Sequence, residues 1–134
     1  MSTALRGLLL VVAAIFMLMG LRWWIDPAGA ASEFGMTLSS GIGLSTEIGD
    51  IASLFLTGSV FMFVAVARRE SKWLYAPLAL VVFAATGRII AWLLHDAAFA
   101  TQFILTEVII AVIALFGIRA LDRAGENADS GRVR

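Results

Sequence analysis

Four long apolar segments, separated by short polar connections, dominate the hydrophobic pattern of the chain. They cover approximately residues 4–25, 48–67, 73–94 and 99–118. Each is close to the about 20 apolar residues that a helix needs to cross roughly 30 Å of hydrocarbon. The pattern therefore predicts an all-α membrane protein, a bundle of four transmembrane helices within residues 1–121.

The composition favours a membrane environment over a water-soluble core. Of the 134 residues, 60% are hydrophobic, and the mean hydropathy is +0.93, whereas soluble domains are about 45–50% apolar. The formal net charge is zero, so nothing offsets the phosphate charge of a nucleic acid, and we expect no such partner. With no cysteine and one histidine, the chain lacks thiol chemistry and the imidazoles of a haem pair. We predict no cofactor and no metal site.

The first segment also resembles a signal peptide, because Arg6 precedes an apolar run that ends near the small residues 28–30. Arg22 and Asp26 make a poor approach to a cleavage site. We therefore expect this segment to be retained as a true membrane span.

Basic residues predict the orientation of the spans. They cluster before the first span, between the second and third, and after the fourth: Arg6; Arg68, Arg69 and Lys72; Arg119, Arg123, Arg132 and Arg134. The other two connections contain acids but neither Lys nor Arg. By the positive-inside rule, both termini lie in the cytoplasm. We expect a multi-pass protein of the bacterial inner membrane, in which residues 122–134 form a polar, disordered cytoplasmic tail.

Ionisable residues interrupt the apolar pattern, all toward the predicted outer side. At about 1.5 Å per residue, Arg88 lies about 9 Å from the outer end of the third span and Glu107 about 12 Å into the fourth. Asp50 stands at the start of the second span, with Glu47 one helical turn before it. An unpaired charge at mid-membrane costs about 2.5–3.5 kcal/mol. We therefore expect Arg88 to pair with Glu107 or Asp50 through a bidentate contact.

Helical periodicity puts these charges on one face of each span. Arg88 shares its face with Trp92 and His95, and Asp50 shares its face with Glu47. If these faces turn inward, one guanidinium meets up to three carboxylates, with His95 at the mouth. The predicted site comprises Glu47, Asp50, Arg88, Trp92, His95 and Glu107.

Two interpretations fit this cluster of charges. One is structural, an ion-paired clasp that fixes the register of the helices. The other is a polar pocket, open to the outside, that binds a ligand head group or relays protons. Ionisable residues within membranes are in general functional, but a small bundle also needs a device for specificity, and the sequence leaves both interpretations open.

The connection between the first two spans, residues 26–47, is long and rich in glycine and serine. Pro27 is expected to end the first helix. Residues 28–34 are expected to form a short turn at the membrane surface, and residues 39–45 a flexible loop. A connection of this length is often functional or a lid, and a loose connector is the alternative.

The segment Asp50-Ile51-Ala52-Ser53-Leu54-Phe55-Leu56, the pair Gly87-Arg88, Asp96 and Glu107 together suggest a relative. Over about residues 5–120 the chain resembles an uncharacterised family of four-span bacterial membrane proteins, a domain of unknown function grouped with the DoxX-like proteins. Members of that family often carry two glycines where this chain has Ala52-Ser53. The resemblance implies a four-helix bundle with the Asp, Arg and Glu turned inward, and it implies no established activity.

No nucleophile with a base, metal constellation or cofactor motif identifies a reaction in this sequence. We predict a non-enzymatic accessory or binding protein with a charged pocket formed by Asp50, Arg88 and Glu107. Its partners would be the lipid bilayer, a bound lipid or quinone, and another membrane protein or further copies of the chain. The alternative is a membrane enzyme or proton-coupled transporter, in which Glu107 and Asp50 carry protons and Arg88 anchors an anionic group.

Overall fold

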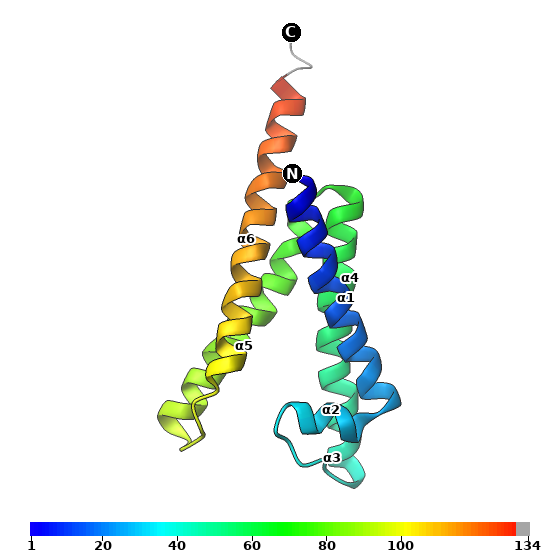
Figure 1. Ribbon diagram of the computed structural model, residues 1–134, viewed down its shortest axis with the longest axis vertical. Helices are drawn as coiled ribbons and strands as arrows, with labels where there is room; N and C mark the ends of the chain where they lie inside the picture. Colours follow the sequence, from blue (N-terminus) through cyan, green and yellow to red (C-terminus); the bar gives the residue numbers. More distant parts are fainter. Residues whose placement is uncertain (131–134) are drawn as a thin grey trace.

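The computed structural model describes residues 1–130, which are helical apart from short connections and contain no strand. The long helices are α1 (Thr3–Ile25), α4 (Ala52–Arg68), α5 (Tyr75–Leu94) and α6 (Thr101–Ser130) (Figure 1). The short elements are α2 (Pro27–Glu33), α3 (Gly41–Thr46), the π-helical turn η1 (Glu47–Ile51) and the 3-10 turn η2 (Ser71–Leu74).

Four helical stretches are long and apolar enough to cross a membrane: Thr3–Ile25, Gly41–Arg68, Ser71–Leu94 and Thr101–Asn127. Many large apolar side chains point outward, for example Leu18 and Phe83, which are 67% and 73% exposed. Such surfaces suit hydrocarbon rather than water. The prediction of an all-helical protein with four candidate spans is confirmed, while the orientation of its termini stays a prediction.

The segment before α4 differs from the sequence expectation. Residues 39–45 were expected to form a flexible loop, but α3 begins at Gly41 and continues through η1 into α4 without a break. Gly41 has a φ of 59°, a left-handed backbone conformation that glycine adopts at no steric cost. The first helix does end before Pro27, at Ile25, as predicted. Asp26 then caps the next helix, α2, because its side chain accepts a hydrogen bond from the amide of Gly29 at 3.0 Å.

The end of the chain also differs from the expectation. Residues 122–134 were expected to be disordered, but α6 runs on to Ser130, and residues 131–134 lie outside the described part. Leu121 is still 5% exposed and packs in the core. The alanine, leucine and arginine of residues 119–124 are good helix formers without a proline to stop them, so the helix continues past the apolar stretch.

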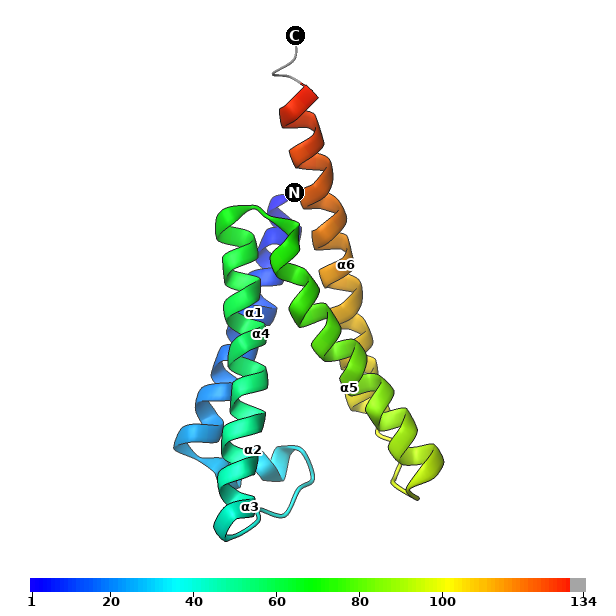
Figure 2. The same cartoon turned by 180° about the vertical axis from the view of Figure 1, so that it is seen from behind.

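The helices form two arms that diverge from a common end (Figures 1 and 2). In the first arm α1 packs along α4, and in the second α5 packs along α6. We call the end with the N-terminus and η2 the closed end, and the end with α2, α3 and the connection between α5 and α6 the open end. The arms share a core at the closed end, which includes Leu9, Met62, Leu74, Val81 and Ile118.

A glycine allows the two arms to meet at the closed end. A Cβ atom on Gly117 would lie 2.8 Å from Leu74 Cδ1 and 3.0 Å from Leu9 Cδ1. Small residues permit such close approach of transmembrane helices. The backbone of α6 therefore comes close to both η2 and α1 at this point, and the arms separate beyond it.

A buried hydroxyl ties α4 to α1. The Ser59 Oγ donates to the carbonyl oxygen of Ala13 at 2.7 Å, and Ser59 is fully buried. Interhelical hydrogen bonds in membrane proteins contribute about 0.6 kcal/mol on average.

We therefore expect Ser59→Ala to lower the free energy of unfolding by about 0.6 kcal/mol, measured by denaturation in mixed micelles. Ser53→Ala is the matched control, because the Ser53 hydroxyl donates only to the Asp50 carbonyl of its own segment. Equal losses for the two variants would show that the bond to Ala13 adds no stability between the helices.

Candidate functional site

Arg88 and Glu107 face one another across the second arm. Arg88 Nε donates to Glu107 Oε1 at 2.8 Å, and the two side chains are 31% and 12% exposed. Arg88 lies six residues before the end of α5, and Glu107 six residues after the start of α6. Because the two helices run antiparallel from a short connection, both residues fall about 9 Å from it, at about 1.5 Å per residue. The fold therefore brings these two charges to the same depth.

An aromatic ring supports the guanidinium. The Arg88 Cζ lies 4.6 Å from the ring centroid of Phe103, which precedes Glu107 by one helical turn. A cation over an aromatic face is attracted to it, more strongly where water is excluded. Arg88 is thus held by a carboxylate and a ring that belong to the same face of α6.

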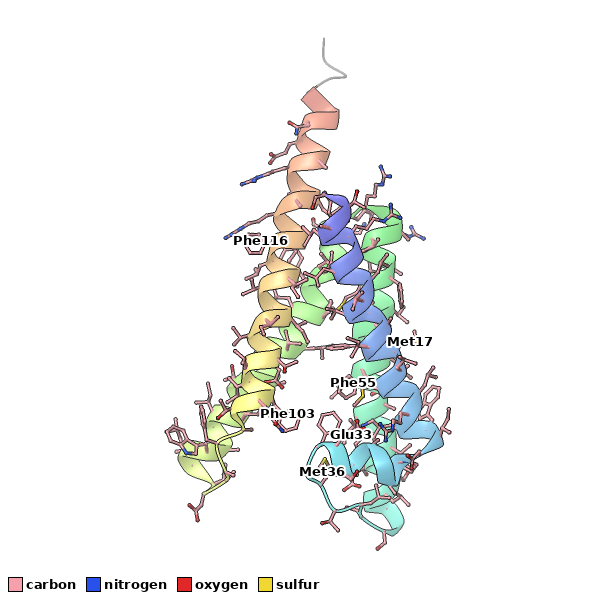
Figure 3. The ribbon with its side chains drawn as sticks, viewed as in Figure 1. Met17, Glu33, Met36, Phe55, Phe103 and Phe116 are labelled. Atoms are coloured by element: carbon pink, nitrogen blue, oxygen red, sulfur yellow. The ribbon has the colours of Figure 1, made fainter. Side chains whose placement is uncertain are left out.

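Phe103 also connects the two arms near the open end. Its ring stacks on that of Phe34, with centroids 5.6 Å apart and planes at 10°. Phe34 follows α2 and also contacts Phe55 at 5.8 Å. In Figure 3, Phe103 points from α6 into the space between the arms, toward the side where α2 and Phe55 lie. The three rings therefore line this space next to the charged pair.

Both members of the pair retain unused hydrogen-bonding capacity. Glu107 Oε2 is buried and has no partner among the described residues. Leaving such an acceptor unsatisfied costs about 1–3 kcal/mol. The guanidinium has five N–H donors, and among the described residues only its Nε forms a hydrogen bond, to Glu107. The pair can therefore accept one hydrogen bond and donate others to a group that lies beside it.

The other two carboxylates of the predicted site lie on the first arm. Glu47 accepts hydrogen bonds from the backbone amide of Ser39, at 3.0 Å, and from its hydroxyl. Asp50 is exposed, and its carboxylate forms no ion pair within residues 1–130. The structure therefore brings Glu107 to Arg88 and does not bring Glu47 or Asp50 to them.

Two features explain why the predicted convergence of three carboxylates is not seen. The arms diverge toward the open end, so the start of α4 moves away from α5 (Figure 2). Glu47 and Asp50 also lie in η1, a π-helical turn. A π-helix bonds residue i to i+5, so the regular spacing from which their common face was predicted does not hold there.

The remaining two predicted residues lie at the end of α5. The Trp92 ring meets Phe99 edge to face at 5.1 Å and is 47% exposed. His95 is the C-terminal cap of α5 and is exposed. Among the described residues, neither side chain forms a hydrogen bond, ion pair or ring contact with the Arg88–Glu107 pair. No group of three or more His, Asp or Glu residues within the described range is placed to hold a metal ion.

The structure reveals a second charged group that the sequence prediction missed. Arg22 near the end of α1 forms an ion pair with Glu33 in α2 and approaches Asp26 at 3.8 Å. Gly29 leaves room for it, because a Cβ there would lie 2.0 Å from Asp26 Oδ2 and 3.0 Å from Arg22 Nη2. The spacing of Arg22 and Asp26, one helical turn, was a visible signal. The partner Glu33 was not, because the chain reverses at Asp26.

The fold and the site combine four helices that are long and apolar enough to cross a membrane with an arginine–glutamate pair between two of them, α5 and α6. No family model, curated protein or solved structure matches the chain. The resemblance to the DoxX-like group therefore stays a prediction, and the function is inferred from the geometry of the site.

Proposed function

We propose that this chain is a membrane-embedded binding protein for an amphipathic ligand. The head group lies against Arg88 and Glu107, and the apolar part lies along the aromatic rings between the two arms. The observation that carries the proposal is the buried Glu107 Oε2, which has no hydrogen-bond partner within residues 1–130, beside a guanidinium that is 31% exposed. A purely structural clasp would use both oxygens, since an unsatisfied buried acceptor is unfavourable.

The chemistry of the pair specifies the head group. Glu107 Oε2 requires a donor, such as a hydroxyl, and the free nitrogens of Arg88 require an acceptor, such as a carbonyl, phosphate or carboxylate oxygen. A lipid or a quinone/quinol head group can supply these groups. A flat ring would in addition stack on Phe34, Phe55 or Phe103. The centroid of the Phe34 ring lies 5.8 Å from that of Phe55 and 5.6 Å from that of Phe103.

A wide-open hollow lies beside this region, at the connection between α5 and α6. It has a volume of about 290 Å³ and is lined by residues 99–103, including Phe103. The cavity lies at the start of α6, and Phe103 joins it to the guanidinium of Arg88.

The proposed placement in the membrane follows from the charge distribution. We propose that the closed end, with Arg6, Arg68, Arg69 and Lys72, faces the cytoplasm of a bacterial inner membrane. The Arg88–Glu107 pair then lies in the outer half. The proton-coupled alternative gains no support, because Asp50 and Glu107 lie on different arms and form no relay.

Native mass spectrometry of the chain, purified in a mild detergent, tests the binding proposal. We expect an adduct with the mass of a lipid or quinone on the wild type, and an affinity for it that is at least about tenfold lower, hence a lower occupancy, on Glu107→Gln. A hydrogen bond to a charged group contributes about 1.5–3 kcal/mol, and 1.4 kcal/mol corresponds to a factor of ten in affinity. Glu126→Gln, the same change at an exposed position of α6, should leave the adduct unchanged.

Circular dichroism identifies any variant that fails to fold, and Arg88→Lys then replaces it, because lysine keeps the charge but loses the planar fork. A wild type without any adduct would contradict the proposal. Equal occupancy on wild type and a folded Glu107→Gln would contradict it as well. An adduct with the mass of a protein would show that a partner helix, rather than a small ligand, occupies the site.

A further inference from the structure

A second cavity lies at the closed end, away from the Arg88–Glu107 pair. Its volume is about 180 Å³, and three helical elements contribute to its lining. The lining residues are Met1 and Arg6 from the start of the chain, Val66 and Arg69 from the end of α4, and Leu121 and Ala124 from α6. At roughly 30 Å³ per water molecule, the cavity has room for a small polar group.

Two arginines that have no ion-pair partner among the described residues supply charge to this cavity. Arg6 and Arg69 are exposed, and neither forms an ion pair within the described residues. The acids of the neighbouring α6 turn, Asp122 and Glu126, form no ion pair with them either. The cavity therefore carries two positive charges that no described carboxylate neutralises.

Lys72, a basic residue at the same end, differs from the two arginines because it has an acidic partner. Lys72 Nζ lies 2.8 Å from Glu70 Oε2, and Trp73 Nε1 donates to the same oxygen at 2.8 Å. The hydrogen bonds from Lys72 and then Trp73 lower the pKa of Glu70, so Glu70 stays ionised and balances Lys72. Within the described residues, the positive charge at this end that has no carboxylate partner therefore centres on Arg6 and Arg69.

The backbone at Arg69 gives an independent indication. Arg69 ends α4 in the left-handed region, at φ 56° and ψ 38°. Helices usually place glycine or asparagine at such a position, because a Cβ atom is unfavourable there. Unfavourable backbone conformations at non-glycine residues tend to occur at functional sites. The left-handed conformation of Arg69 therefore agrees with a functional role for this residue and supplements the evidence from the cavity.

The base of the cavity is apolar and lies at the boundary of the spans. Val66 and Leu121 are 3% and 5% exposed, and Arg69 lies between the two candidate spans Gly41–Arg68 and Ser71–Leu94. Basic pockets between transmembrane helices at this level bind the head groups of anionic lipids. Guanidinium groups match phosphate oxygens through paired hydrogen bonds.

We infer that Arg6 and Arg69 form a binding site for the phosphate group of an anionic phospholipid. The phosphate lies between the two guanidiniums, and the glycerol and acyl chains continue over Val66 and Leu121 along the apolar surface. This site does not depend on the proposed ligand of Arg88 and Glu107, which lies toward the opposite end of the bundle.

Binding of phosphatidylglycerol to the full chain in detergent, measured by native mass spectrometry, tests the inference. We expect phosphatidylglycerol to bind more tightly than phosphatidylcholine, and an Arg6→Gln/Arg69→Asn variant to lose at least about tenfold in occupancy. Asparagine tolerates the left-handed backbone, so the helix end is preserved. The control Arg119→Gln/Arg123→Gln removes the same charge from exposed positions of α6 that do not line the cavity, and it should bind like the wild type.

Several results would overturn the inference. Equal binding of the two lipids, or an equal loss in the control variant, would show that the arginines provide no specific site. Full displacement of phosphatidylglycerol by inorganic phosphate alone would show that free phosphate, not lipid, is recognised. If the double variant loses its helical circular dichroism signal, Arg6→Gln alone is used, and unchanged occupancy in that variant would contradict the assignment.

Discussion

Arg88→Leu is expected to lower the free energy of unfolding by about 3–5 kcal/mol, with a value toward the lower end because Arg88 is 31% exposed. The variant leaves Glu107, 12% exposed, without its partner between apolar helices. A lone charge within a membrane is costly, by about 2.5–3.5 kcal/mol on insertion scales. Denaturation in mixed micelles measures the change.

The double variant Arg88→Leu/Glu107→Leu measures whether the two charges are energetically coupled. We expect it to regain most of the stability, because two leucines leave no uncompensated charge between the helices. Glu70→Gln is the control for a surface pair. Lys72 and Glu70 are 68% and 41% exposed, so breaking their contact should leave the stability nearly unchanged. Additive losses in the double variant would show that Arg88 and Glu107 are not energetically coupled.

The same double variant also distinguishes the two interpretations of the pair. A stable double variant that no longer carries the ligand adduct would show that the charges serve binding. A stable double variant that keeps the adduct would show that they serve the register of α5 and α6. The pair would then be a structural device and the ligand site would lie elsewhere.

Gly20→Ala is expected to destabilise the first arm by about 1–3 kcal/mol, the usual cost of overpacking. A Cβ at Gly20 would lie 2.6 Å from Leu56 Cγ and 3.2 Å from the carbonyl oxygen of Ala52. Neither atom is the free end of a flexible side chain, so α1 and α4 would have to separate. The thermal unfolding midpoint in detergent reports the change.

Gly7→Ala is the matched control, because it places the same methyl group on the same helix where no atom lies within 4 Å. This variant should be neutral or stabilised by up to about 1 kcal/mol, since alanine is the better helix former. A Gly20→Ala variant that behaves like Gly7→Ala would show that α1 and α4 are not in close contact at this position.

The sequence predicted the four long helices well because their signals are local. Apolar length defines a span, and Pro27 ends a helix whatever surrounds it. The common depth of Arg88 and Glu107 also followed from counting residues back from the connection between α5 and α6. These features need no knowledge of how the helices pack.

Which residues lie beside Arg88 in the charged site depends on how the helices pack, and the sequence predicted this less well. Asp50 and Glu47 carry carboxylates and were predicted at a depth similar to that of Arg88, so the sequence made both candidate partners. The π-helical turn changes the direction of these side chains, and the divergence of the arms holds their segment away from Arg88. The Arg22–Glu33 pair and the Phe34–Phe103 stack were not predicted for the same reason, since each joins segments whose relative position the local sequence does not fix.

The hydrophobic and polar pattern by itself determined that the chain has four apolar helices and that Arg88 and Glu107 lie at similar depths. The tertiary structure decided which carboxylate Arg88 meets, because that depends on the angle between the arms. It also placed Arg6 and Arg69 around one cavity. Helical periodicity fixes directions around a single helix axis, whereas the angle between two helices is set by side-chain sizes at their contact, here at Gly117.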